Sequence, residues 1–232
     1  MRKLGFFIGV VVGAASVFSY QMMEKKHHPS AFPILERQGY TLAYDSRGKI
    51  PFWTHEQISK ESLAKVADRK RMDFCEDPHL YASHRSTLED YAKSGFDRGH
   101  VVPAADVRFS DEALKETFYL SNIAPQHPQC NRGMWVQLER YVRMLVDEEG
   151  PLEVISGPLF IPQKGKDGKR YVTYQVIGKN DVAVPTHFFK VIKNVLKTWV
   201  YVIPNGPVKG ELKDYQFSLE ELERISGIQF TY

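Results

Sequence analysis

The order of strand-like and helical segments is the feature that most constrains the fold of this chain. Residues 40–44 and 50–54 are rich in aromatic and β-branched side chains and flank a glycine-containing turn, which predicts a β-hairpin. Further strands are predicted at 152–161, 171–178, 183–193 and 198–203. These segments do not follow the regular β-α-β alternation that indicates a parallel sheet. The sequence therefore predicts an α+β protein.

Helices are predicted in three places. Ser110 can cap a helix over residues 111–118, because its hydroxyl can accept a hydrogen bond from an unpaired backbone N–H. Apolar residues at helical spacing predict a second helix from about 133 to 146. A capping box at 218–221 opens a third, which Gly227 ends. The stretches 69–85 and 119–126 are predicted to be loops.

The N-terminal residues form a separate unit. Residues 4–20 are an almost uncharged run, with two basic residues before it and a charged stretch at 24–28 after it. A run of about 17 apolar residues is short for a bilayer-spanning helix and long for a signal-peptide core. We predict that residues 1–28 are a targeting segment or, preferably, an uncleaved membrane anchor. Residues 29–232 are then a single domain outside the cytosol.

Composition sets only broad limits. At 43% hydrophobic and 25% charged, the chain has the composition of a globular protein, which argues against disorder. The formal net charge of +3 is too small to indicate nucleic-acid binding by itself. Cys75 and Cys130 are too few for a disulfide framework, and a single bridge stays open.

The stretch Asp97-Arg98-Gly99-His100 carries the densest chemistry of the chain. Histidine exchanges a proton near neutral pH, and the planar guanidinium of arginine matches phosphate oxygens. Glycine between them allows a sharp bend or a close approach of the backbone to a phosphate. This combination points to phosphodiester chemistry.

Other polar residues allow two interpretations each. Arg71 and Arg85 could contact phosphate or belong to a solvated loop, and His79 and His84 lack the companions of a zinc pattern. Helical spacing would let Asn131, Glu139 and Arg143 border one cleft. In the alternative, Asn131 caps the helix, and Glu139 and Arg143 form a surface ion pair.

Several ordered motifs together resemble one family. They are D-R-G-H at 97–100, F-Y-L-S-N-I-A-P-Q at 118–126, N-x-x-x-W at 131–135 and L-E-x-Y-x-R at 138–143. The chain is similar in these to the DNA/RNA non-specific endonucleases, and residues 156–160, 174–180 and 184–190 are similar to the endonuclease G branch. The resemblance implies a ββα-metal (His-Me finger) fold, with a central, mainly antiparallel sheet flanked by helices. It also implies Mg²⁺-dependent hydrolysis of DNA and RNA that leaves 5′-phosphate ends, with Mn²⁺ as another possible metal.

The resemblance implies roles for individual residues. His100 would be the general base, Asn131 would hold the metal, and Glu139 would hold metal-bound water. The remaining assignments place Arg98, Arg71 and Arg143 at the scissile phosphate, Asn122 near the metal, Arg85 at the substrate, and Asp97 as a brace of the motif or a substrate contact. Cys130 and Arg132 depart from the family, in which leucine and glutamine flank the asparagine.

The resemblance also bears on partners and location. It implies a homodimer, in the mitochondrial intermembrane space if the source is eukaryotic, or in the periplasm or secreted if bacterial, with residues 4–20 contacting the membrane. Two other functions stay open: a nucleic-acid-binding module that has lost catalysis, and a small-molecule phosphodiesterase on the same fold.

Overall fold

The computed structural model describes residues 32–230. The segment 1–28, predicted to be a targeting segment or anchor, lies outside this range. Within the described range, no helix combines the length and the apolar character that crossing a bilayer requires.

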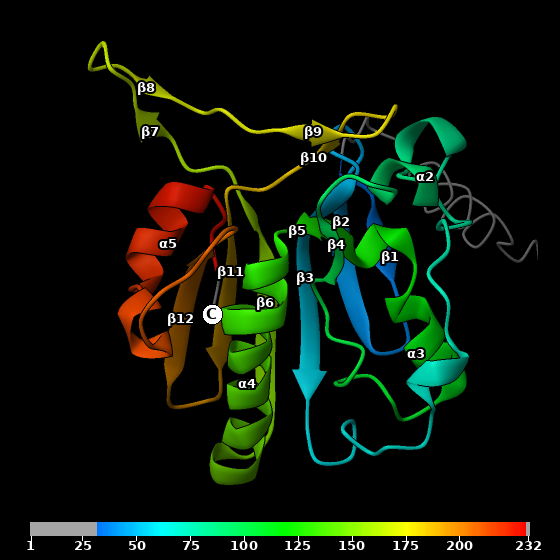
Figure 1. Ribbon diagram of the computed structural model, residues 1–232. Coiled ribbons are helices and arrows are strands. Elements are labelled where there is room, and N and C mark those ends of the chain that lie inside the picture. Colours follow the sequence, from blue (N-terminus) through cyan, green and yellow to red (C-terminus); the bar gives the residue numbers. More distant parts are fainter. Residues whose placement is uncertain (1–31, 231–232) are drawn as a thin grey trace, which may run out of the picture. The chain divides into compact units, whose positions relative to one another are not determined.

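A six-stranded sheet forms the centre of the domain (Figure 1). Its order is β1-β2-β3-β6-β11-β12, and every neighbouring pair is antiparallel. The strands are β1 (Ile34–Glu36), β2 (Tyr40–Asp45), β3 (Ile50–Ile58), β6 (Leu152–Leu159), β11 (His187–Lys193) and β12 (Thr198–Pro204). The predicted α+β class and antiparallel sheet are confirmed.

Two helices cover the two faces of this sheet. Side chains alternate along a strand, so the adjacent Phe188 and Phe189 of β11 enter different cores, and both are fully buried. The core that contains Phe188 also takes the apolar side of α4 (Val136–Glu149). The core that contains Phe189 takes Leu222 of α5 (Leu219–Ser226), the helix predicted from the capping box.

A smaller unit lies beside the sheet. Strand β4 (Asp97–His100) pairs antiparallel with β5 (Ile123–Gln126), and α3 (Asp111–Thr117) lies between them in the chain. An irregular helical segment, Cys130–Trp135, then leads into α4. This order is the strand–strand–helix unit that the resemblance implied. The prediction of a loop over residues 119–126 was wrong for its second half, which forms β5. This strand contains Pro125 and pairs with a strand that is distant in sequence, so no local pattern indicated it.

The remaining elements are short. The predicted strand at 171–178 is divided between β8 (Arg170–Tyr171), in an arm at upper left in Figure 1, and β9 (Val176–Ile177), at the top of the domain. Their partners are β7 (Gln163–Lys164) and β10 (Val182–Ala183). The other short elements are α2 (Leu88–Tyr91) and the 3-10 turns Arg69–Arg71, Ala82–His84, Leu120–Asn122 and Leu212–Tyr215.

Candidate active site

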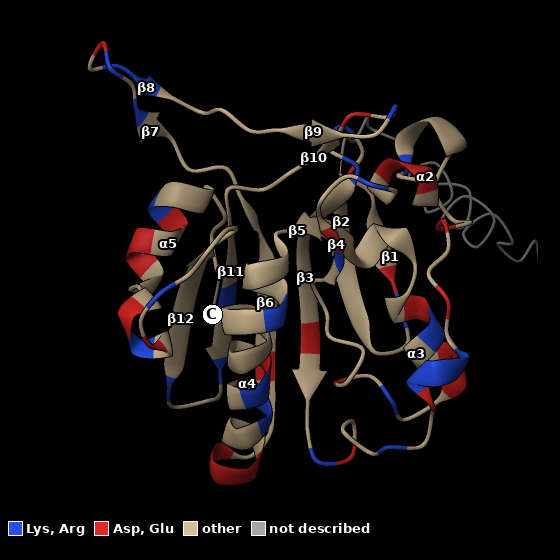
Figure 2. Cartoon of the chain, in the orientation of Figure 1, with Lys and Arg blue, Asp and Glu red and all other residues tan. Residues whose placement is uncertain are grey.

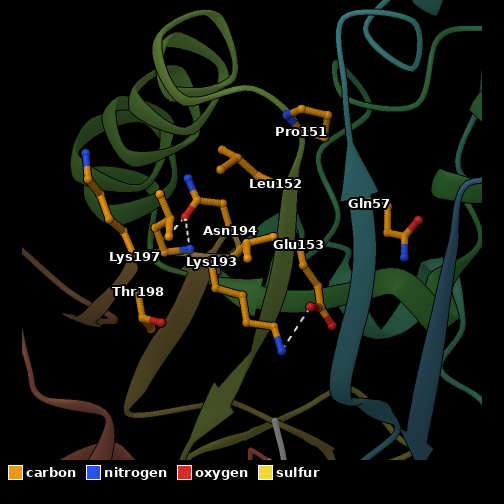
Figure 3. Close-up of a pocket in the computed structure, with 10 residues that line it drawn as sticks. Gln57, Pro151, Leu152, Glu153, Lys193, Asn194, Lys197 and Thr198 are labelled. Carbon is orange, nitrogen blue, oxygen red and sulfur yellow. Dashed lines mark hydrogen bonds and ion pairs between the residues drawn. The ribbon is translucent and has the colours of Figure 1, made fainter.

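A cavity of about 360 Å³ gathers side chains that the sequence places far apart. β4 supplies Arg98 and His100, the irregular segment supplies Asn131, and α4 supplies Glu139. Arg69 and Arg140 also line it. A larger cavity of about 670 Å³ lies near the β11–β12 turn, where Lys193 forms an ion pair with Glu153 2.9 Å away (Figure 3). The smaller cavity is the candidate active site, because it contains the histidine, the amide and the carboxylate.

His100 is held between two aromatic rings. Its ring centroid lies 5.2 Å from that of Phe74 and 4.9 Å from that of Phe118. Burial, together with the smaller effect of the positive charge of Arg69, lowers the pKa of His100 to about 3. The imidazole is therefore neutral at neutral pH, the form that can accept a proton. Its Nε2 is buried without a hydrogen-bond partner among the described residues.

The same two rings also support the arginines of the cavity. The guanidinium of Arg98 lies 4.6 Å from the centroid of Phe74, and that of Arg69 lies 5.8 Å from the centroid of Phe118. Such cation–π contacts fix where a flexible arginine points. Arg69 was not among the predicted site residues. The signal was the basic run 69–71, from which Arg71 was chosen, but it is Arg69 that lines the cavity.

Side-chain hydrogen bonds orient Asn131, which does not lie in a regular α-helix. Its Nδ2 donates a hydrogen bond to Oδ2 of Asp97 at 2.8 Å, and Arg132 donates to both carboxylate oxygens of Asp97, at 2.9 and 2.6 Å. Burial acts to raise the pKa of Asp97, but the hydrogen bonds from Arg132 and Asn131 outweigh it and hold that pKa below its usual value. Asp97 thus braces side chains, whereas the sequence predicted a brace of the backbone. Gly133 has φ −107° and ψ −109°, which is not helical. The helical spacing that was assumed between Asn131 and Glu139 therefore does not apply.

Glu139 has no hydrogen bond or ion pair within residues 32–230. Burial and the nearby charge of Asp106 raise its pKa to about 7, against the opposing effect of Lys190, Arg143 and Arg69. Asn131 offers an amide oxygen to the same cavity. Two hard oxygen donors, one of them a carboxylate without a partner in the described chain, fit a magnesium site completed by water.

Five predicted site residues are not among those that line the cavity: Asn122, Arg143, Arg85, Arg71 and Asp97. Asn122 is buried, and its amide hydrogen-bonds the backbone of Val102 and Thr117, so it positions the segment that follows His100. Arg143 binds Asp106 at 2.7 Å, so the alternative ion pair with Glu139 is not formed. Arg85 binds Glu76 at 2.7 Å and the carbonyl of Asp77.

A buried group of charges lies between the sheet and α4. Glu56 on β3 and Asp106 are 3% exposed, and Lys190 on β11 is 1% exposed. Figure 2 shows charged positions on β3 and on β11. Nζ of Lys190 donates to Oγ of Ser156 at 2.6 Å, whereas neither oxygen of Glu56 has a hydrogen-bond partner in the described part of the chain. Burial raises the pKa of Glu56 well above its usual value.

Gly99 is required by a close approach inside the β4–β5 pair. A Cβ at this position would lie 2.1 Å from Oε1 and 2.5 Å from Cγ of the buried Gln126. From the sequence, Gly99 was predicted to allow a sharp bend or a close approach of the backbone to a phosphate. In the structure, the group that approaches Gly99 is the side chain of Gln126 on the partner strand.

We therefore expect Gly99→Ala to destabilise the domain by roughly 1–3 kcal/mol, because an overpacked side chain must move. Thermal unfolding of the purified protein measures this loss. Gly206→Ala is the matched control, because a Cβ there has open space. Equal unfolding midpoints for the two variants would contradict the close approach.

The comparison with known families decides what this site belongs to. The model of the DNA/RNA non-specific endonuclease family matches residues 21–232. The chain belongs to this family. It is thus an endonuclease, a hydrolase of phosphodiester bonds, as the D-R-G-H and later motifs predicted.

Individual relatives agree with the family match. The chain is 45% identical over 209 residues to human "Endonuclease G, mitochondrial", covering 87% of this chain and 70% of that protein. It is 41% identical over 211 residues to "Nuclease C1" of Cunninghamella echinulata var. echinulata, covering 87% and 83%. A solved structure titled "Crystal structure of the EndoG/EndoGI complex: Mechanism of EndoG inhibition" superposes with a TM-score of 0.83 at 40% identity, covering 88% of this chain and 87% of that one. The predicted ββα-metal fold is confirmed.

Proposed function

We propose that this endonuclease cleaves both DNA and RNA with His100 as the general base. The convergence of His100, Asn131 and Glu139 in one cavity lined by four arginines is the observation that carries the proposal. The neutral imidazole accepts a proton from a water molecule, and the resulting hydroxide attacks phosphorus in line with the 3′ oxygen. Breaking the bond to that oxygen, which takes up a proton from solvent water, leaves a 3′-hydroxyl and a 5′-phosphate.

Arg69 and Arg98 act on the phosphate. Arg98 lies over the ring of Phe74 and Arg69 over that of Phe118, and both residues line the cavity. Each can donate hydrogen bonds to nonbridging oxygens, and these contacts strengthen as negative charge develops on the phosphate. Positive charge at this place also helps to keep His100 neutral.

Asn131 and Glu139 are the residues that would hold Mg²⁺, with Mn²⁺ as a second candidate. Asn131 would contribute its Oδ1 directly, and Glu139 would bind water molecules of the ion. When bound, the ion supplies Lewis-acid stabilisation of the nonbridging oxygen and of the departing 3′ oxygen. The pKa of Glu139 near 7 in the absence of a cation is consistent with a carboxylate that a cation completes.

The wider assignments belong to the same proposal. We place residues 1–28 as a targeting segment or anchor, with residues 4–20 contacting a membrane, and residues 29–232 as one nuclease domain that forms a homodimer. The word "mitochondrial" in the name of the human relative supports a mitochondrial location, in the intermembrane space if the source is eukaryotic. In a bacterium the domain would be periplasmic or secreted.

The proposal predicts that purified protein cuts supercoiled plasmid and single-stranded RNA with Mg²⁺, and that EDTA stops both reactions. The contacts proposed are to phosphates and not to bases, so the rate at low substrate concentration should fall steeply with salt. New ends should accept label from a polynucleotide kinase only after phosphatase treatment. Rapid cleavage of one polymer and none of the other would contradict the proposal.

The same assay separates the two alternatives. Binding of DNA without any cleavage would identify a module that has lost catalysis. Hydrolysis of a small phosphodiester, such as bis(p-nitrophenyl) phosphate, without cleavage of either polymer would identify a small-molecule phosphodiesterase.

A further inference from the structure

The orientation of Asn131 needs an explanation beyond the helix that follows it. Asn131 lies in the segment Cys130–Trp135, which is not a regular α-helix and is interrupted by the non-helical backbone of Gly133. A regular helix would fix the direction of the side chain through its backbone. Here the neighbouring side chains have to do so.

The two ends of the Asn131 amide are not equivalent toward a cation. The oxygen can bind a metal ion, whereas the NH₂ group can only donate hydrogen bonds. Oδ2 of the Asp97 carboxylate lies 2.8 Å from Nδ2 of Asn131, and an ionised carboxylate only accepts hydrogen bonds. The contact therefore selects the orientation in which Nδ2 faces Asp97 and Oδ1 is available to the cavity.

Asp97 is itself fixed by Arg132. Nε of Arg132 donates to Oδ2 at 2.9 Å and Nη2 donates to Oδ1 at 2.6 Å, so the planar guanidinium binds the carboxylate through two hydrogen bonds. A two-pronged contact sets the rotation of the carboxylate plane as well as its position. Oδ2 is shared between Arg132 and Asn131, so a rotation of Asp97 would displace the Asn131 amide.

We propose that Arg132 is a positioning residue that, through Asp97, holds the amide oxygen of Asn131 toward the metal position. The proposal rests on the proposed role of Asn131 in holding the ion. It assigns a purpose to a position where this chain departs from the glutamine expected of the family. Arg132 also borders the cavity and its side chain is 71% exposed, so a direct contact with substrate phosphate is the competing role.

Direct metal binding in the absence of substrate distinguishes the two roles. Mn²⁺ binding to the purified full chain can be measured from the EPR signal of the free ion. Arg132→Gln is expected to weaken Mn²⁺ binding by about 10-fold, the size of effect seen when the partner of a metal ligand is removed. Removing a positive charge near the site would by itself strengthen cation binding, so positioning and charge predict opposite signs.

Two further variants provide matched controls. Arg140→Gln removes another exposed arginine that lines the same cavity, and no contact joins Arg140 to Asp97 or Asn131 within residues 32–230; its Mn²⁺ affinity should be unchanged or higher. Arg132→Lys keeps the charge but not the two-pronged hydrogen bond, so most of the loss should remain. Unfolding midpoints close to that of the unaltered chain are expected, because Arg132 is exposed.

The outcomes are distinct. Unaltered or tighter Mn²⁺ binding by Arg132→Gln, together with a raised KM for DNA, would overturn positioning and establish a phosphate contact. Wild-type binding by Arg132→Lys would also overturn it, because charge alone would then suffice. If Asn131→Ala binds Mn²⁺ as well as the unaltered chain does, the proposed metal role of Asn131 fails, whatever Arg132 does.

Discussion

His100→Ala is expected to lower kcat for plasmid cleavage by about 10²–10⁴-fold, the usual contribution of a positioned general base. Affinity for DNA should change little, because the proposed phosphate contacts come from Arg69 and Arg98. Mn²⁺ binding should also persist, because Asn131 and Glu139 remain. Steady-state cleavage, a DNA-binding titration and an Mn²⁺ titration measure the three quantities. Added imidazole is expected to restore part of the lost rate, since truncation leaves space between Phe74 and Phe118.

His84→Ala is the matched control. It removes the same side chain from an exposed 3-10 turn that does not line the cavity. Its kcat should equal that of the unaltered protein. A His100→Ala variant that is folded and still cleaves at the original rate would contradict the assignment of the base, and would require another group to take the proton.

Local signals predicted those parts of the fold that local interactions determine. The hairpin of β2 and β3 follows from strand-forming residues around a glycine turn, and α3 and α5 follow from their capping serines. Strand β5 was missed because its four residues, ending in Pro125 and Gln126, gain strand geometry only from pairing with β4. In the sequence, β4 and β5 are separated by α3. A pairing between segments so distant in sequence has no local signature.

The candidate site could be predicted only as far as motifs reach. His100, Arg98, Asn131 and Glu139 stand in motifs, and they converge in one cavity. The aromatic support was not predicted, because Phe74 and Phe118 are apolar residues without a catalytic signature. Arg69 was not predicted for a related reason: within a run of three basic residues, no local signal shows that it is Arg69 that contacts Phe118 and lines the cavity.

The buried charges beneath the site lead to the second large expected effect. Glu56, Asp106 and Glu139 provide three carboxyl groups, whereas Arg143 and Lys190 provide two cations. Lys190→Met keeps the approximate size of the side chain but removes one cation and the hydrogen bond to Ser156. Removing one partner from a buried charge pair costs about 3–5 kcal/mol, because the remaining charges stay desolvated. We expect a loss of that size in the free energy of unfolding near neutral pH.

The loss should depend on pH in a definite direction. Burial already raises the pKa of all three carboxyl groups in the folded chain, and without Lys190 these pKa values rise further. The folded state then binds more protons than the unfolded state, so stability falls as pH rises above the pKa of the unfolded carboxyl groups. Urea unfolding at pH 5 and pH 8 should show the larger deficit at pH 8. Lys179→Met, which removes an exposed ion pair with Glu89, should change the free energy of unfolding little at either pH. Equal losses for the two lysines, or a larger Lys190→Met deficit at pH 5, would mean that Lys190 does not neutralise these carboxylates.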